Sequence, residues 1–287
     1  MRAIWPGALL VVYLGATGAL LLVGWARISV ADVALHFGVL GAIAAATWIS
    51  RLPRWIRDWA PLLALLFLYT EMPALIRAAG HEQMFDATAL RWETAAFAGQ
   101  PALDWAARWP SVVVSEALHL AYLSYYLIIF SVPAMLYFTG RRQEFSEAVL
   151  VLMLTFVACF VAYLVFPVEG PRYSWASSSR APEGPVRAFV VWLLEARSSR
   201  GTAFPSSHVA VSVAQSLLAW RYLGAQGLPI AVLSAGLALG AVYGGFHYGV
   251  DVIAGAVLGT AIAVSWIAVT HTRSRDVPIH ANATAPT

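Results

Sequence analysis

Long apolar runs constrain this 287-residue chain more than any other feature. A helix needs about 20 apolar residues to cross the hydrocarbon core of a bilayer, and the continuous rather than alternating runs argue against a closed barrel. Hydrophobic residues make up 60% of the chain and charged residues 11%, against about 45–50% and about 25% in soluble domains. The sequence therefore predicts an all-α polytopic membrane helical bundle. We expect about eight spans, near residues 7–26, 30–50, 59–79, 112–138, 146–166, 204–223, 228–245 and 247–270.

The spans and the segments between them divide the chain into four regions. Residues 1–80 hold N-terminal membrane spans, and residues 112–271 hold the remaining spans. In residues 81–111, apolar and aromatic side chains recur at three and four positions, which predicts short helices lying in the interface on the outer side. Residues 272–287 form a polar tail that we expect to be disordered.

The arginine distribution predicts the orientation. All 18 basic residues are arginine, and short loops rich in basic residues favour the cytoplasmic side. With eight spans, both chain termini and four arginine-bearing segments share that side: 51–57, 140–142, 220–222 and 271–275. Residues 80–111, 167–203 and 244–247 then face the extracytoplasmic side of a cell membrane. The net charge of +3, without a basic block, argues against a nucleic-acid partner.

The stretch RGTAFPSSH begins at Arg200 and leads into an apolar run. Pro205 suits the first turn of a helix. Ser206 and Ser207 are then expected where free backbone N–H groups and the helix dipole attract anions such as phosphate. The Arg200 guanidinium adds a forked donor for phosphate oxygens, and His208 follows at the interface. The alternative is a capped helix start with a structural histidine.

The stretch HYGVD places His247 four residues before Asp251 at the start of the last span. On a helix the two side chains would share a face. An unpaired charge inside the membrane is costly, so the pattern predicts a His–Asp pair. Such a carboxylate fixes the imidazole tautomer and favours the imidazolium. The alternative is a structural pair that pins helices together.

Three further polar groups stand near the outer side. A Gly-Pro turn presents Arg172 and Tyr173 after the fifth span. Glu116 and His119 lie about one turn apart near the outer end of the fourth span, and ionisable groups within a membrane are functional candidates. Bracing between helices is the alternative for this pair.

Two motifs, PSSH ending at His208 and HYGVD beginning at His247, each open a span about forty residues apart. In this they resemble the type 2 phosphatidic acid phosphatase superfamily. With GPRY at 170–173 and HLAYLSYYLIIF at 119–130, the pattern is most similar to its inositol phosphorylceramide synthase-type (inositolphosphotransferase) branch. The resemblance covers about residues 119–260. It implies a six-helix phosphatase-type core with extra N-terminal spans, so that residues 112–271 would be the catalytic membrane core.

The resemblance also implies roles for individual residues. His247 would be the nucleophile, Asp251 would orient and activate it, and His208 would protonate the leaving oxygen. The residues that would bind the substrate phosphate are Arg172, Arg200, Ser206 and Ser207. The candidate contacts for a head group or an acceptor are Tyr173, Tyr248, Glu116 and His119.

The chain departs from the family pattern at three places. The family's first motif pairs a lysine with an arginine followed by proline, whereas this chain has no lysine and Arg172 precedes tyrosine. The Ser-Arg pair expected in the third motif is Gly240-Ala241 here, so Arg200 is the candidate replacement for the missing arginine. Ser207 stands where many members have glycine. These departures leave the substrate open.

The motifs predict an enzyme that cleaves or transfers the phosphoryl group of a lipid phosphate or phospholipid head group through a phosphohistidine intermediate. No metal and no cofactor are expected, and the partners are the lipid, the bilayer and a candidate alcohol acceptor. Water as the acceptor gives a phosphatase, and an alcohol gives a phosphotransferase. A transporter would place ionisable residues near the bilayer middle, whereas these gather at one interface. An inactive lipid-binding protein is the remaining alternative.

Overall fold

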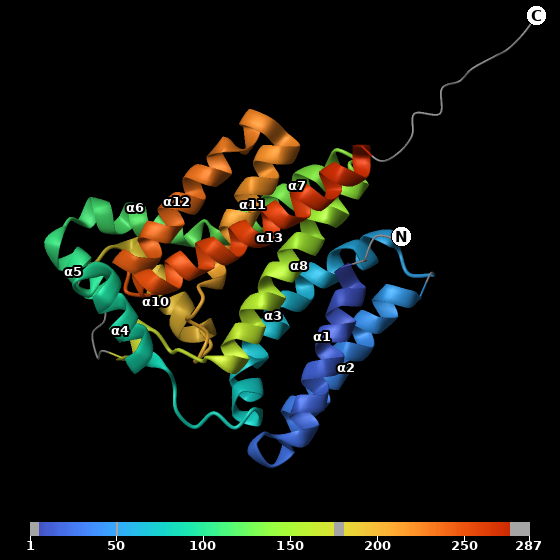
Figure 1. Ribbon diagram of the computed structural model, residues 1–287, viewed down its shortest axis with the longest axis horizontal. Helices are drawn as coiled ribbons and strands as arrows, with labels where there is room; N and C mark the ends of the chain where they lie inside the picture. The colour runs from blue at the N-terminus through green and yellow to red at the C-terminus, as the bar shows by residue number, and fades with distance from the viewer. Residues whose placement is uncertain (1–5, 50, 175–180, 276–287) are drawn as a thin grey trace, which may run out of the picture.

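The computed structural model describes residues 6–49, 51–174 and 181–275. Of the tail 272–287 that was expected to be disordered, residues 272–275 are helical, and the rest lies outside the described residues. Figure 1 shows a bundle of helices, and the described residues contain no β-strand beyond one isolated bridge between Val168 and Thr202. The helices are α1 (Pro6–Val23), η1 (Trp25–Arg27), α2 (Val30–Trp48), α3 (Arg54–Ala78), α4 (Asp86–Phe97), α5 (Pro101–Arg108), α6 (Val112–Leu123), α7 (Tyr125–Phe138), α8 (Arg142–Val165), α9 (Pro171–Ser174), α10 (Pro185–Arg197), α11 (Ser207–Leu223), η2 (Gly224–Gly227), α12 (Leu228–Tyr243) and α13 (Gly249–Arg275).

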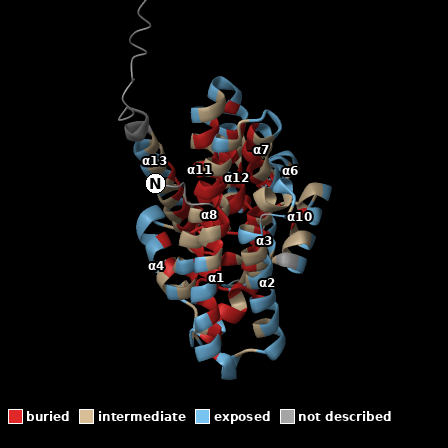
Figure 2. Ribbon diagram, turned by 90° about the vertical axis from the view of Figure 1, so that its right-hand side faces the viewer, coloured by how far each residue is buried: buried red, intermediate tan, exposed pale blue. Residues whose placement is uncertain are grey.

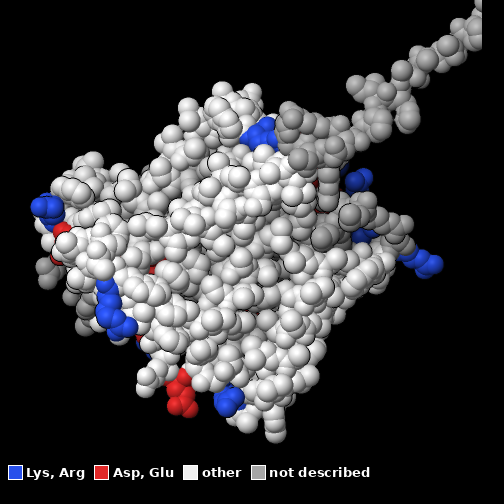
Figure 3. Space-filling view, viewed as in Figure 1, with Lys and Arg blue, Asp and Glu red and all other residues white. Residues whose placement is uncertain are grey.

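The helices account for the predicted membrane spans. Six helical segments of the described chain are long and apolar enough to cross a membrane, and α6 with α7, bent by 40° at their junction, can form a seventh. One of the six, Ser207–Tyr243, consists of α11 and α12, which pack against each other as a hairpin (Figure 1). Counting its two arms separately gives eight. Charged side chains lie mainly around the rim of the face seen in Figure 3. The predicted all-α membrane bundle is confirmed.

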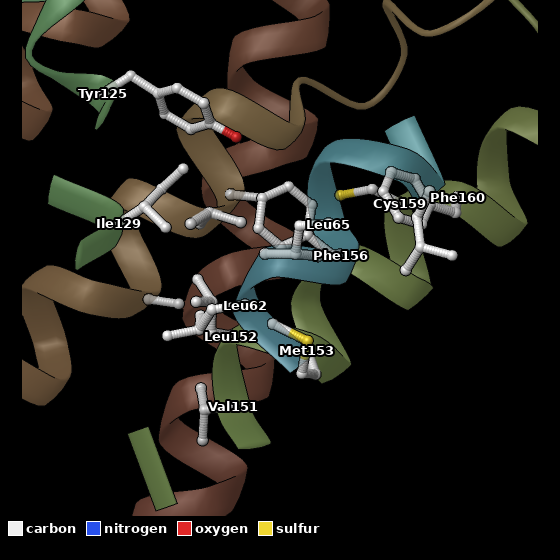
Figure 4. Close-up of a cluster of buried hydrophobic side chains, with 14 of the residues drawn as sticks. Leu62, Leu65, Tyr125, Ile129, Val151, Leu152, Met153, Phe156, Cys159 and Phe160 are labelled. Carbon is white, nitrogen blue, oxygen red and sulfur yellow. The ribbon is translucent and has the colours of Figure 1, made fainter. Parts of the chain in front are cut away.

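Helix α8 forms the centre of the bundle. It packs against α1, α3, α7, α11 and α13, and Figure 2 shows buried residues concentrated in the interior between these helices. Figure 4 shows side chains of α8 meeting those of α3 and α7, including Phe156, Leu65 and Ile129. Because lipid tails are as apolar as these side chains, close packing rather than the hydrophobic effect holds such helices together.

Two glycines bring α13 against α11. A Cβ atom on Gly255 would lie 2.4 Å from the carbonyl oxygen of Ser206, and one on Gly259 would lie 2.0 Å from that of Ala210. Small residues four apart allow membrane helices to approach this closely. The contact starts at Ser206, beside His208, so this seam sets the distance between the two histidine motifs.

The loops that carry the motifs meet at one end of the bundle. The Phe85 N–H donates to the carbonyl of Pro167 at 2.8 Å, and the Ala203 N–H donates to the carbonyl of Val168 at 2.8 Å. At the other end, the Arg141 guanidinium donates to the carbonyl of Tyr222 at 2.8 Å, and Trp59 stacks edge-on against Tyr137. The loops rich in polar site residues and the arginine-bearing loops therefore lie at opposite ends (Figure 1).

Candidate active site

A hollow at the loop end of the bundle brings the two histidine motifs together. His208 from α11 and His247 from the loop before α13 both line it, with ring centroids 5.7 Å apart. Arg172 and Tyr173 of α9 and Tyr69 of α3 line it too. Reacting atoms approach within about 3–3.5 Å before reaction, so a phosphate group in this hollow can contact both rings. We call it the histidine hollow.

The His247 ring is held through one nitrogen. Its Nδ1 lies 3.1 Å from the carbonyl oxygen of Ala203 and 3.5 Å from Oδ2 of Asp251. A carbonyl oxygen only accepts hydrogen bonds, so this contact places the proton on Nδ1. The other nitrogen, Nε2, then carries a free lone pair. That is the protonation state a nucleophilic imidazole requires.

Asp251 caps the N-terminus of α13 and also faces His247. Its fully buried carboxylate accepts the Tyr248 N–H at 2.8 Å, as an acidic residue at the third helical position does when it reaches back to the cap. The helix therefore begins at Gly249, and His247 lies in the loop before it. The prediction that His247 and Asp251 share a helix face is wrong, because the helix that follows this cap starts two residues after His247. The pair forms across the cap instead.

His208 is sandwiched by aromatic rings. Its ring stacks on Tyr122 at a centroid distance of 5.2 Å and tilts against Tyr125 at 4.2 Å. The Tyr122 hydroxyl lies 3.4 Å from Nε2 of His208, and Nδ1 has no partner among the described residues. The rings fix the orientation of the imidazole and leave one of its nitrogens available.

Arg172 reaches the same hollow from a short, well-anchored helix. The carboxylate of Asp86 accepts the N–H groups of Glu169 and Gly170, both at 2.9 Å, and so holds the turn that leads into α9. Gly170 has φ of +93°, and a Cβ atom there would lie 3.0 Å from that of Ala203. The Nη1 atom of Arg172 is buried without a partner in the described chain. A buried guanidinium N–H without an acceptor favours binding of an anion.

The two serines do not face the histidine hollow. Ser206 is the N-cap of α11, its hydroxyl accepts the Val209 N–H at 3.4 Å, and its own N–H donates to the carbonyl of Asp251 at 3.0 Å. The Ser207 N–H donates to the hydroxyl of Tyr163 at 3.2 Å. Pro205 lies before the helix rather than in its first turn, because Ser206 is the better cap. The backbone N–H groups of Ser206, Ser207 and Val209 are thus bonded within the protein.

Comparison of the sequence with protein-family profiles identifies the family. Residues 90–265, more than half of the chain, match the sequence profile of the PAP2 superfamily. The chain belongs to the PAP2 superfamily. Membership supports a phosphatase-type enzyme in a membrane. No curated protein and no solved structure matches the chain significantly.

The remaining predicted site residues of this PAP2 protein lie at different distances from the hollow. Tyr173 lines it, and its hydroxyl donates to Ser198 at 3.2 Å. Arg200 lies outside it, paired with Glu169 at 3.3 Å. Tyr248 is fully buried behind it, 2.9 Å from the Ser174 hydroxyl.

Glu116 and His119 also lie outside the histidine hollow. Glu116 accepts the N–H groups of Val186 and Arg187 at 2.9 and 3.0 Å and so caps α10. The Nδ1 atom of His119 lies 2.6 Å from the carbonyl of Ser115 in its own helix. The Glu116 contact fits bracing between helices, whereas this His119 contact lies within one helix.

Several residues of the PAP2 site were not predicted. Asp86 and Glu93 of α4 hold the site from outside the spans: Glu93, fully buried, accepts the N–H groups of Gly249 and Val250 at 2.8 and 2.9 Å. Burial raises the pKa of the Glu93 carboxyl, and these two backbone N–H groups oppose the rise. Tyr69 lines the hollow from α3. No motif or spacing in the sequence points to these three residues.

Proposed function

We propose that this PAP2 protein is an integral membrane enzyme that cleaves or transfers the phosphoryl group of a lipid phosphate or phospholipid head group through a phosphohistidine at His247. One observation carries the proposal. His247, whose Nδ1 is held by Ala203, lines one hollow with His208, whose ring is 5.7 Å away, and with Arg172, whose Nη1 has no partner in the described chain. A nucleophile, an acid and an anion clamp are thus in reach of one phosphate.

In the first step the lone pair on Nε2 of His247 attacks phosphorus. The N–P bond forms while the bond from phosphorus to the leaving oxygen breaks, and protonated His208 gives its proton to that oxygen. Arg172 binds the phosphate oxygens, whose charge must be stabilised in the transition state. Asp251 stabilises the positive charge that forms on the imidazole ring.

In the second step an acceptor hydroxyl attacks the phosphoryl group. His208, now neutral, takes the proton of that hydroxyl, and the N–P bond breaks to regenerate His247. Water as acceptor gives a phosphatase. An alcohol such as inositol gives a phosphotransferase of the inositol phosphorylceramide synthase type, which the GPRY and HLAYLSYYLIIF stretches favour.

The position of the hollow supports a lipid substrate on the extracytoplasmic face of a cell membrane. The hollow opens at one end of the bundle, where a head group meets the interface while its chains stay in the bilayer. The arginine-bearing loops lie at the other end, and such loops favour the cytoplasmic side. Both chain termini are then cytoplasmic. We also assign residues 81–111, with α4 and α5, to the outer interface.

Phosphate release from mixed lipid phosphates by the purified protein tests the function. The wild type is expected to release phosphate and His247→Ala to release none, with folding checked by gel filtration. Equal phosphate release by both proteins would refute the proposed enzyme activity, and a lipid-binding protein or a transporter would remain as the alternatives. Repeating the assay on labelled phospholipid with and without inositol distinguishes hydrolysis from transfer.

A further inference from the structure

A second hollow lies beside the histidine hollow, at the junction of the N-terminal helices with the loops of the PAP2 core. It encloses about 990 Å³ including open solvent, against about 360 Å³ for the histidine hollow. Its polar lining consists of Arg27, Arg77, His81, Glu82, Glu169 and Arg200. We call it the arginine hollow.

Most of this lining comes from outside the family match. Arg27 belongs to η1, Arg77 to the last turn of α3, and His81 and Glu82 to the loop that follows. All four precede residue 90, where the PAP2 match begins. The arginine hollow is therefore a feature that this chain's N-terminal spans add to the core.

The arginines of this hollow are incompletely paired. Arg200 has its ion pair with Glu169, but no carboxylate lies within 4 Å of the Arg27 or Arg77 guanidinium in the described chain. Arg27 has a 3.4 Å contact to the carbonyl of Ala78, at the end of α3. Arg77 is exposed and has no such contact among the described residues. Arginine is the side chain that best matches the oxygens of a phosphate.

The two hollows are neighbours. Glu169 lines both, and the Arg200 guanidinium lies 4.9 Å from the ring of Tyr173, which lines the histidine hollow. Glu169 is therefore shared by the two hollows, and its ion-pair partner Arg200 lines the arginine hollow.

We infer that the arginine hollow binds a phosphate group other than the one that His247 attacks, with Arg77 as its principal contact. The binding rests on the unpaired arginines alone. Its consequence, selection of a substrate or acceptor that carries a second phosphate, rests on the proposed function. The same chemistry can come from a lipid head group or from free phosphate.

Binding to the full-length His247→Ala protein in neutral detergent tests this without turnover. Inorganic phosphate, dioctanoyl phosphatidic acid and dioctanoylglycerol, which carries no phosphate, are titrated calorimetrically. Adding Arg77→Ala is expected to weaken binding of at least one of the first two by about tenfold or more, and to leave binding of dioctanoylglycerol unchanged. An effect on both ligands identifies a general phosphate site, and an effect on phosphatidic acid alone identifies the lipid head group.

Arg91→Ala is the matched control, since Arg91 is exposed on α4, bonded to Thr88 and outside both hollows. Arg172→Ala reports the histidine hollow separately. Equal phosphate and phosphatidic acid affinities for Arg77→Ala and Arg91→Ala, or a loss that extends to dioctanoylglycerol, would overturn the inference. Binding that depends on Arg77, in a protein whose wild type neither releases phosphate nor transfers it to inositol, would refute the proposed function and leave this inference standing.

Discussion

Replacing Asp251 by asparagine separates two roles that a carboxylate beside a histidine can have. In a triad the carboxylate both fixes the imidazole tautomer and stabilises its positive charge. Here the carbonyl of Ala203, 3.1 Å from Nδ1 of His247, already fixes the tautomer. In the Asp251→Asn variant the amide oxygen can keep the bond from the Tyr248 N–H, and the amide NH₂ replaces Oδ1, which has no partner in the described chain. The substitution therefore removes mainly the charge.

The expected loss follows from the 3.5 Å separation of Nδ1 and Oδ2. A hydrogen bond to a charged group contributes about 1.5–3 kcal/mol, and Coulomb's law at an effective dielectric of about 20 gives an upper bound of about 4.7 kcal/mol at that distance. At about 1.36 kcal/mol per tenfold change, Asp251→Asn should lower kcat by about 10-fold to about 3,000-fold.

Steady-state phosphate release from a lipid phosphate measures this loss, with His247→Ala as the inactive reference. A decrease of about 10⁴-fold or more, typical of a histidine forced into the wrong tautomer, would show that Ala203 does not hold the proton on Nδ1. An unchanged kcat would show that Asp251 takes no part in stabilising the charged ring. Either result refutes the reasoning.

Three further predictions concern phosphate binding by Arg172, the stabilising role of Glu93 and the independence of the reaction from metal ions. Arg172→Ala should lower kcat/KM by about 10-fold to about 150-fold through loss of a charged hydrogen bond, Arg172→Lys should lower it less, and Arg200→Ala should have a smaller effect than Arg172→Ala on a substrate with one phosphate. Glu93→Ala leaves two N–H groups of α13 unpaired, at about 1–3 kcal/mol each, so its melting temperature should fall. Because burial raises the pKa of the Glu93 carboxyl, an uncharged side chain is tolerated better there. The melting temperature should therefore fall less in Glu93→Gln than in Glu93→Ala, and the reverse order would contradict this explanation. Adding EDTA should keep the rate of phosphate release within about twofold of the untreated rate. A loss of activity that a divalent cation restores would refute the metal-free mechanism.

The helices were predictable because lipid leaves the backbone few options. A continuous apolar run in a bilayer must satisfy its own hydrogen bonds, and only a helix does so within one segment. The predicted spans therefore agree with the helices to within a few residues over most of the chain, for example 30–50 against Val30–Trp48. The helix beginning near His247 was placed two residues too early, since the cap formed by Asp251 is a local hydrogen bond that hydropathy does not detect.

The meeting of His208 with His247 was also predictable, from motifs and from topology, although their roles stay proposals. The residues that hold the two histidine motifs in place could not be predicted. Asp86 holds a turn more than 80 residues away, and Glu93 caps a helix more than 150 residues away. No spacing in the sequence encodes such pairs. The serines misled for a related reason: a hydroxyl at a helix start serves equally as a phosphate donor or as a cap, and only the packing against α8 and α13 decides.

Trapping the covalent intermediate tests the central claim most directly. Wild-type protein is mixed with a ³²P-labelled lipid phosphate, quenched in alkali within the first turnovers, digested and analysed by mass spectrometry. The account predicts an acid-labile, alkali-stable phosphoryl group on His247, present in the wild type and absent from His247→Ala. Substrate turnover by the wild type with no label on His247, or with label on another side chain, would contradict it.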